Sequence, residues 1–443
     1  MDQIYRQPDI NQKQEQFNSL PNVDVPRSRF DRSHGHLTTF DIGNVYPVFC
    51  DEILPGDSVE MNATAFCRLA TPLRPLMHRL DIDIMFFFCA CRLVWENWQK
   101  FMGERHDPAD DPDLYSIPQL RRAMSTTAPT AANMDNWHYF GLPYVCESGT
   151  PNLDVNALPF RALALFWNEW LRDQNIDDSV DVPFNDTLDT STTLLTLHKR
   201  NKKRDYFSSC LPWPQKGDAV SVPLGTSAPV TGIGGVNQTY AAGPTNVYET
   251  DGSGTTSYAA YKSTSSTNNV YIEEDPSNTG FPNIRADLSN ASAITVNALR
   301  DAITTQQFFE RDARGGTRYI ELIQSHFAVT SSDSRLQRTE LLAYGVSAIE
   351  INPIAQVSES GTTPQGNLAA IGTGLVQCSF EKAFEEHGYL IGIISGRADL
   401  IYQRQVNKMW SRTARLDFVW PEFAHLGEQA VENKELFYTG TAT

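Results

Sequence analysis

The sequence lacks the cysteine pattern of a disulfide framework or of a zinc site. It has 7 cysteines in 443 residues, an odd number, and no CxxC pair. Because disulfides need paired cysteines and structural zinc sites need closely spaced thiolates, this pattern favours reduced, mostly buried thiols in a protein made in a cytoplasm. The cysteines are Cys50, Cys67, Cys89, Cys91, Cys146, Cys210 and Cys378.

Long hydrophobic runs are also scarce. Residues 1–16 contain no apolar stretch that would act as a signal peptide, so we expect a protein that is not exported. The longest strongly apolar run, Ile84–Ala90, is far shorter than the ~20 residues that a membrane span requires. We therefore expect no membrane association, and we predict that Ile84–Ala90 is a buried strand.

Basic residues are the minority, with 36 Lys and Arg against 53 Asp and Glu and a net charge of -17. This balance excludes a uniformly basic surface for nucleic acid, so any contact with DNA must be local. The densest basic patch is residues 198–204, followed at once by Tyr206 and Phe207, a combination typical of single-strand binding. The alternative is a surface loop that pairs with acidic neighbours. The predicted nucleic-acid-binding residues are Lys199, Arg200, Lys202, Lys203 and Arg204.

Catalytic motifs are absent in any context that would support them, including GxSxG, the P-loop, HExxH and GxGxxG. Asp81 and Asp83 share a strand face, as glycosidase carboxylates can, but a solvated face is the simpler interpretation. His34 and His36 alternate like a cupin metal pair, yet no glycine precedes them and the next glutamate is Glu52. We therefore predict no enzyme, no catalytic residue, no cofactor and no metal site.

Apolar residues are sufficient for a sizeable core, at 41% of the chain with 11% aromatics. From Leu80 to Phe88 the pattern has a period of two, and we expect its first half to be solvated on one face. Other apolar runs predict strands at 344–351 and 388–395. Short strands separated by long loops favour an antiparallel β-sandwich or jelly roll.

Helical periodicity occurs in four places. Between Pro159 and Asp173 the apolar residues form one stripe, with Arg161, Asn168, Glu169 and Arg172 on the opposite side. Helices are also expected at 94–102, at 296–312, where Thr295 is the expected cap, and at 318–327.

Two segments differ from the rest in composition. Residues 1–27 are polar and contain three prolines, which predicts an extended arm ordered by contact with neighbours. In residues 225–280, Gly, Ser and Thr supply 25 of 56 positions and few aliphatic side chains remain. Such a segment cannot build a core of its own, so we expect a surface insertion that is either a mobile loop or a lobe stabilised by copies of itself.

Several blocks of sequence, in this order, resemble the major capsid protein of the Microviridae, and of its gokushovirus branch. They include LPFRALALFWNEWLRDQN (158–175), RDYFSSCLPWPQKG (204–217), residues 310–338 and residues 384–437. The resemblance implies one eight-stranded antiparallel jelly roll over residues 28–443, with long loop and helical insertions. It also implies that the insertion 225–280 forms a protrusion on the threefold axis.

The resemblance further implies a structural protein that assembles with itself into a T=1 icosahedral shell around a circular single-stranded DNA phage genome. Implied partners are that DNA, a small basic DNA-binding protein, a minor spike or pilot protein, and the host cell surface. The protein would reside in the virion after assembly in the bacterial cytoplasm. Two alternatives are a secreted, lectin-like jelly roll that binds carbohydrate and a cupin-type metalloenzyme. The missing signal sequence and the failed cupin spacing weigh against them.

Overall fold

The structure is a computed structural model. The chain divides into two units, residues 1–40 and residues 41–443. In the first unit, residues 28–40 contain no helix or strand and are almost entirely exposed. Every helix and strand named below belongs to the second unit. The structure describes residues 28–72, 76, 78–104, 111–129, 134–222, 230–231, 285–286, 295–330, 337–362, 364–366, 368–424 and 429–440.

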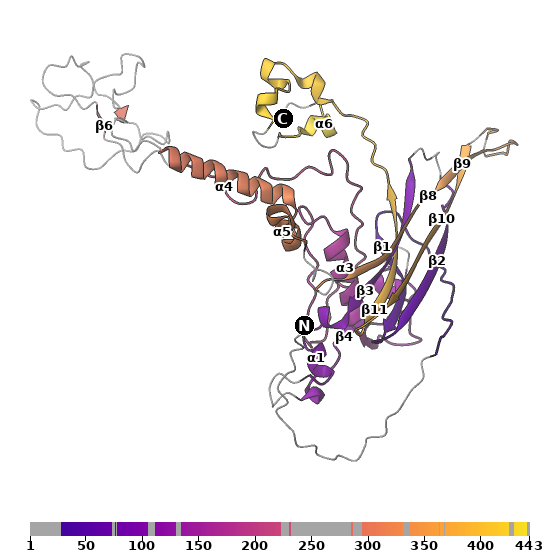
Figure 1. The fold of residues 1–443 in the computed structure, drawn as a ribbon. Helices are drawn as coiled ribbons and strands as arrows, with labels where there is room; N and C mark the ends of the chain where they lie inside the picture. The colour runs from indigo at the N-terminus through magenta and orange to yellow at the C-terminus, as the bar shows by residue number, and fades with distance from the viewer. Residues whose placement is uncertain are drawn as a thin grey trace, which may run out of the picture. The chain divides into compact units, whose positions relative to one another are not determined.

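Strand β3 (Leu80–Ala90) lies inside a four-stranded antiparallel sheet (Figure 1). The order in this sheet is β1 (Val45–Ile53), β11 (Gly388–Ala398), β3 and β8 (Glu340–Ala348). Strand β11 therefore pairs with β1 and β3, so strands that are far apart in the sequence become neighbours in the sheet. The predictions of a buried strand at Ile84–Ala90 and of a strand starting at Gly388 are confirmed.

A second antiparallel sheet packs against one face of the first. It consists of β2 (Ser58–Arg68), β10 (Leu368–Ala383) and β9 (Glu350–Ala355) in the order β2-β10-β9. The two sheets approach closely, because a Cβ atom added at Gly345 of β8 would lie 2.5 Å from the carbonyl oxygen of Gln377 in β10. The predicted β architecture of antiparallel sheets is thus confirmed.

Helix α3 (Leu158–Phe166) covers the opposite face of the four-stranded sheet and continues into the π-helical turn η4 (Trp167–Leu171). The Phe87 ring of β3 stacks on the Phe166 ring with centroids 3.7 Å apart. Pro159 occupies the first turn, where its missing N–H costs nothing. β3 is therefore buried on both faces, by the second sheet on one side and by α3 on the other.

Smaller elements complete the part near α3. Strands β4 (Gln119–Ala123) and β5 (Asn152–Asn156) pair with each other, and α2 (Asn136–Tyr139) places Trp137 in their core. The helix predicted at 94–102 is wrong in extent, because only α1 (Trp98–Phe101) is α-helical there. The buried Trp95 lies outside it, and its indole bonds to Asp186. Two 3-10 turns, η1 (Cys91–Leu93) and η2 (Pro112–Leu114), flank α1.

Two helices follow the Gly/Ser/Thr-rich segment, α4 (Val296–Gly315) and α5 (Tyr319–Phe327). The Thr295 hydroxyl accepts the Ala298 amide at 3.1 Å, so the predicted cap is confirmed. Two-residue strands β6 (Val230–Thr231) and β7 (Arg285–Ala286) pair with each other. The last part contains η7 (Lys408–Ser411), η8 (Arg415–Asp417), η9 (Pro421–Phe423) and α6 (Asn433–Leu436). No helix among the described residues has the length and apolar character of a membrane span.

All seven cysteines are described and all are free thiols, as the sequence predicts. Only Cys89 and Cys91 are buried, so the expectation of mostly buried thiols was wrong. Burial raises the pKa of Cys91 to about 12 and raises that of Cys89 well above its ordinary value. Both thiols therefore stay protonated and unreactive.

Candidate functional site

The basic segment, residues 198–204, runs along the start of strand β1. The Val45 amide donates to the His198 carbonyl at 2.8 Å, and the Arg200 amide donates to the Gly43 carbonyl at 2.9 Å. These main-chain bonds extend the edge of the four-stranded sheet by a short stretch of antiparallel bridge. Successive side chains of the segment consequently point to opposite sides.

Two residues of the basic segment, Arg200 and Lys203, contact two aspartates of β3. Asp81 and Asp83 are each only 1% exposed. The Lys203 ammonium contacts Asp81 and lies 3.0 Å from Oδ1 of Asp399, and the Arg200 guanidinium lies 3.6 Å from Oδ2 of Asp83. We define the ion-pair cluster as Arg79, Asp81, Asp83, Arg200, Lys203, Arg397 and Asp399.

The remaining members of the ion-pair cluster surround the same two aspartates. Arg79 Nε donates to Asp81 at 2.8 Å, and Tyr344 donates its hydroxyl to Asp83 at 3.1 Å. Arg397 Nε lies 2.7 Å from Oδ2 of Asp83 without the alignment of a hydrogen bond, so this contact is electrostatic. With four cations and three carboxylates, the cluster has a net charge of +1. The buried carboxylates are thus compensated, as burial of charge requires.

The pKa values of Arg200 and Asp81 are both shifted, but both residues stay charged. Burial lowers the pKa of Arg200 to about 10, helped by the positive charge of Arg397 and opposed by Asp83. Burial by itself would raise the pKa of Asp81, but hydrogen bonds from Lys203 and Arg79 hold that pKa below its ordinary value. Arg200 and Asp81 are therefore both charged at neutral pH.

His198, the first residue of the basic segment, is also buried. Its ring stacks on Trp167 with centroids 5.0 Å apart, and Trp167 Nε1 donates to the carbonyl of Lys199 at 2.7 Å. Burial lowers the pKa of His198 to about 4. His198 is consequently neutral at physiological pH and adds no positive charge to the segment.

The structure divides the five predicted nucleic-acid-binding residues into two groups. Lys199, Lys202 and Arg204 are exposed, whereas Arg200 and Lys203 belong to the ion-pair cluster. The alternative interpretation, a loop that pairs with acidic neighbours, describes the second group. DNA contact stays a prediction, and the three exposed side chains are those that remain available for it.

The interpretation of Asp81 and Asp83 as a solvated strand face was wrong. Their period of two is that of a half-exposed strand, but a segment more than 100 residues later in the chain covers them. The sequence held one signal of this contact, the coincidence of buried-strand carboxylates with a basic run in an otherwise acidic chain. The charges alone do not identify which basic residue pairs with which aspartate.

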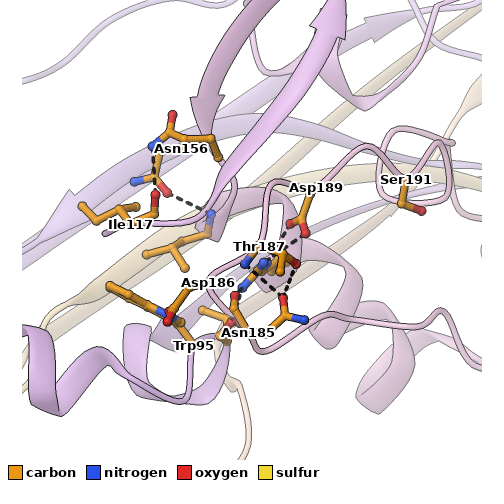
Figure 2. A network of polar contacts seen from close by, with 12 residues as sticks. Trp95, Ile117, Asn156, Asn185, Asp186, Thr187, Asp189 and Ser191 are labelled. Atoms are coloured by element: carbon orange, nitrogen blue, oxygen red, sulfur yellow. Dashed lines mark hydrogen bonds and ion pairs between the residues drawn. The ribbon is translucent and has the colours of Figure 1, made fainter. Parts of the chain in front are cut away.

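A second buried ion pair, which sequence reasoning missed, fixes the loop around residues 185–189 (Figure 2). Arg161 is fully buried and donates from Nε and Nη2 to the Asp189 carboxylate at 2.8 and 3.0 Å. In the same loop, Asp186 accepts hydrogen bonds from the Trp95 indole and from Asn97 at 2.8 Å. The placement of Arg161 on the solvent side of its helix was therefore wrong, because the loop folds over that side and supplies its counter-charge.

The two histidines considered as a metal pair lie in the exposed stretch 28–40. His34 Nδ1 is 2.9 Å from the Arg32 carbonyl, a local turn contact. Among the described residues, no group of three or more His, Cys, Asp or Glu side chains is arranged to hold a metal ion.

Comparison with known proteins decides the family. A family model described as capsid protein (F protein) matches residues 18–443. The chain belongs to this family. Its similarity to known members confirms the resemblance to Microviridae capsid proteins.

Three relatives of this capsid protein are each named capsid protein VP1. The protein of Bdellovibrio phage phiMH2K is 44% identical, over 97% of this chain and 80% of its own. That of Chlamydia phage 1 is 35% identical over 95% and 79%, and that of Spiroplasma virus 4 is 31% identical over 98% and 80%. These relatives give the lectin-like alternative no support.

In this capsid protein, large apolar side chains are exposed in several regions, including these two. One is the outer face of the three-stranded sheet, where Phe66 and Leu375 lie directly opposite each other on β2 and β10. The other follows β11, where Trp410, Leu416 and Val419 are exposed. Clustered apolar exposure of this kind marks interaction surfaces in soluble proteins.

Proposed function

We propose that this chain is the major capsid protein of a small, non-enveloped bacteriophage. It assembles with itself into a T=1 icosahedral shell that encloses a circular single-stranded DNA genome. The observation that carries the proposal is family membership over residues 18–443. A shell subunit needs extensive surfaces that bind further copies, and the exposed apolar regions suit that need. The protein resides in the virion and is assembled in the host cytoplasm.

The fold that suits this role is a single eight-stranded jelly roll, in which β1, β11, β3 and β8 belong to one sheet and β2, β10 and β9 belong to the other. Its support is the pairing of sequence-distant strands in the four-stranded sheet and the close packing of the second sheet on it. Residues 28–443 form this capsid domain, and residues 1–27 form the extended arm. Residues 225–280 form the surface insertion at the threefold axis. The arm and nearly all of the insertion lie outside the described residues, so composition and position support them.

The net charge of the chain indicates how the charge of the packaged genome is neutralised. At a net charge of -17, the shell cannot neutralise packed DNA by itself, which favours a small basic protein as partner. Local contact with the DNA comes from Lys199, Lys202 and Arg204, the exposed cations of the basic segment. A minor spike or pilot protein and the host cell surface are the remaining partners.

Electron microscopy and analytical ultracentrifugation of the purified full-length chain test the assembly proposal. We expect uniform closed particles, and when the chain is expressed with phage DNA, nuclease-resistant single-stranded DNA inside them. A protein that stays monomeric under all conditions, or particles of variable size, would contradict the proposal.

The DNA contact is tested separately by replacing Lys199, Lys202 and Arg204 together with glutamine. We expect normal particles whose DNA is released at lower salt, because fewer counterion-releasing contacts hold it. Arg300→Gln, which removes an exposed cation from α4, serves as the control. Unchanged salt dependence in the triple variant, or a particle structure with these side chains on the outer surface, would overturn this assignment.

A further inference from the structure

The C-terminal segment, which we define as residues 400–424, exposes an unusual set of large apolar side chains. Trp410 is 75% exposed, Leu416 is 70% exposed and Val419 is 84% exposed. Ile401, Met409, Phe418 and Phe423 are also exposed. Single exposed apolar residues are ordinary, but this many within one short segment mark an interaction surface.

Local hydrogen bonds fix the shape of the C-terminal segment. The Asp417 carboxylate accepts the amides of Thr413 and Ala414, both at 2.7 Å. The Trp420 indole donates to the Arg415 carbonyl at 3.0 Å, and Asn407 caps the turn η7. The exposed apolar side chains are therefore presented on a preorganised backbone, which reduces the ordering cost of binding.

The C-terminal segment is positive in an acidic chain. It contains Arg404, Lys408, Arg412 and Arg415 against Asp417 and Glu422, a net charge of +2, so the rest of the chain carries -19. The Arg412 and Arg415 guanidinium groups lie over the rings of Phe418 and Trp420, at 5.2 and 5.0 Å from the ring centroids. Arginine, tryptophan and methionine together are typical of the centre of protein–protein interfaces.

The outer face of the β2-β10-β9 sheet has the complementary character. Phe66 is 69% exposed and Leu375, directly opposite it, is 52% exposed. Ile354 and Ile371 extend this apolar strip across β9 and β10. The charged residues on the same face are Glu60, Glu350 and Glu381 against Arg68, which gives it a net charge of -2.

We propose that the C-terminal segment of one copy binds the outer face of the β2-β10-β9 sheet of a second copy. The proposal rests on the proposed function of self-assembly and names the surfaces that carry it. Each surface has an apolar centre and charges of the sign opposite to the other. Because two different surfaces meet, the contact is head-to-tail, the type that generates closed rings when the rotation between copies permits.

Single-stranded DNA is the competing occupant, since cations and aromatic rings also bind nucleic acid. The aliphatic side chains distinguish the two. Leu416 and Val419 are among the most exposed side chains of the segment, and they have no ring on which a base can stack. A second apolar protein surface covers them, whereas a nucleotide backbone does not.

Photo-crosslinking in assembled particles identifies the occupant. The full-length chain carries p-benzoylphenylalanine in place of Val419, with replacement of Leu114, an exposed apolar residue elsewhere, as the control. We expect covalent dimers of the chain from position 419, with mass spectrometry placing the second end on β2, β9 or β10. Adducts with DNA, with another protein or with a different part of the second copy would overturn the proposal.

A charge exchange tests the same contact by assembly yield. Arg412→Glu combined with Arg415→Glu places negative charge against the acidic sheet face, and we expect particle yield to fall about tenfold. Adding Glu350→Lys and Glu381→Lys should restore it. Equal yields in all variants would contradict the contact, and if the variants do not fold, the crosslinking result decides. A wild-type chain that forms no particles would instead refute the proposed function.

Discussion

The two ends of strand β3 are equally buried but by different chemistry. At the end nearer Ala90, Met85, Phe87 and Cys89 pack in an apolar core under helix α3. At the other end, Asp81 and Asp83 are enclosed by cations of the ion-pair cluster. Apolar burial needs only an apolar neighbour, whereas buried carboxylates need particular partners at particular distances. Substitution by another apolar side chain should therefore cost little stability at the apolar end. At the charged end, loss of a single charged group should cost much more.

The sharpest test of this comparison moves a carboxylate by one residue. Ile84→Asp places it next to Asp83 but on the other side of the strand, within the buried interior. We expect a loss of about 5 kcal/mol or more and failure to fold, because the charged carboxylate would be buried in that interior. Ile84→Val, the control, should cost only about 1 kcal/mol in chemical denaturation. A folded, stable Ile84→Asp protein would show that the stability of the fold does not depend on which side of β3 a buried carboxylate lies.

The second test removes a carboxylate from the charged end. Asp83→Ala leaves Arg200 and Arg397 buried without their shared counter-charge, and we expect a loss of about 3 to 5 kcal/mol in the free energy of unfolding. Combining it with Arg397→Met should recover part of that loss, since one unpaired cation is removed. Strictly additive losses in this double-mutant cycle would argue against a coupled cluster.

The third test uses pH. The pKa of His198 is about 4 in the folded protein and near 6.5 when unfolded, so the unfolded chain binds the proton more readily between these values. Stability should be complete above about pH 7 and fall by up to about 3 kcal/mol as pH drops to 4. The pKa of Asp81 is lowered from 3.8, so protonation of this carboxyl reduces stability at pH values below those at which His198 titrates. His198→Gln should remove most of the slope between pH 6.5 and 4.

The smallest expected effect comes from deleting residues 225–280. Their composition offers few aliphatic side chains to the core, and among the described elements only the short β6–β7 pairing is lost. We expect the unfolding free energy to change by less than about 1 kcal/mol, with a changed particle exterior or host attachment. Loss of soluble, folded protein would show that both ends of β3 depend on this segment.

The apolar parts of the fold were predictable from the sequence. The run Ile84–Ala90 and the stripe after Pro159 indicated a buried strand and a core helix, because period and apolar content report local burial. The Thr295 cap was predictable for the same reason, as its geometry is local.

The charged parts were not predictable in the same way. Arg161 and the pair Asp81 and Asp83 were assigned to solvent because polar residues usually face it. Their partners are Asp189 in one case and the basic segment in the other, both brought close only by the folded chain. Long-range charge pairing leaves no periodicity, and two of the five predicted DNA-binding residues, Arg200 and Lys203, belong to the ion-pair cluster.

The free thiols have a consequence for the life of a particle. With no disulfide within the subunit, and with Cys89 and Cys91 held protonated by burial, the folded chain has no internal crosslink for a reductant to break. A capsid built from this chain therefore loses no covalent link within its subunits when the surrounding redox potential changes. Non-covalent contacts between neighbouring copies are likewise insensitive to a change of redox potential.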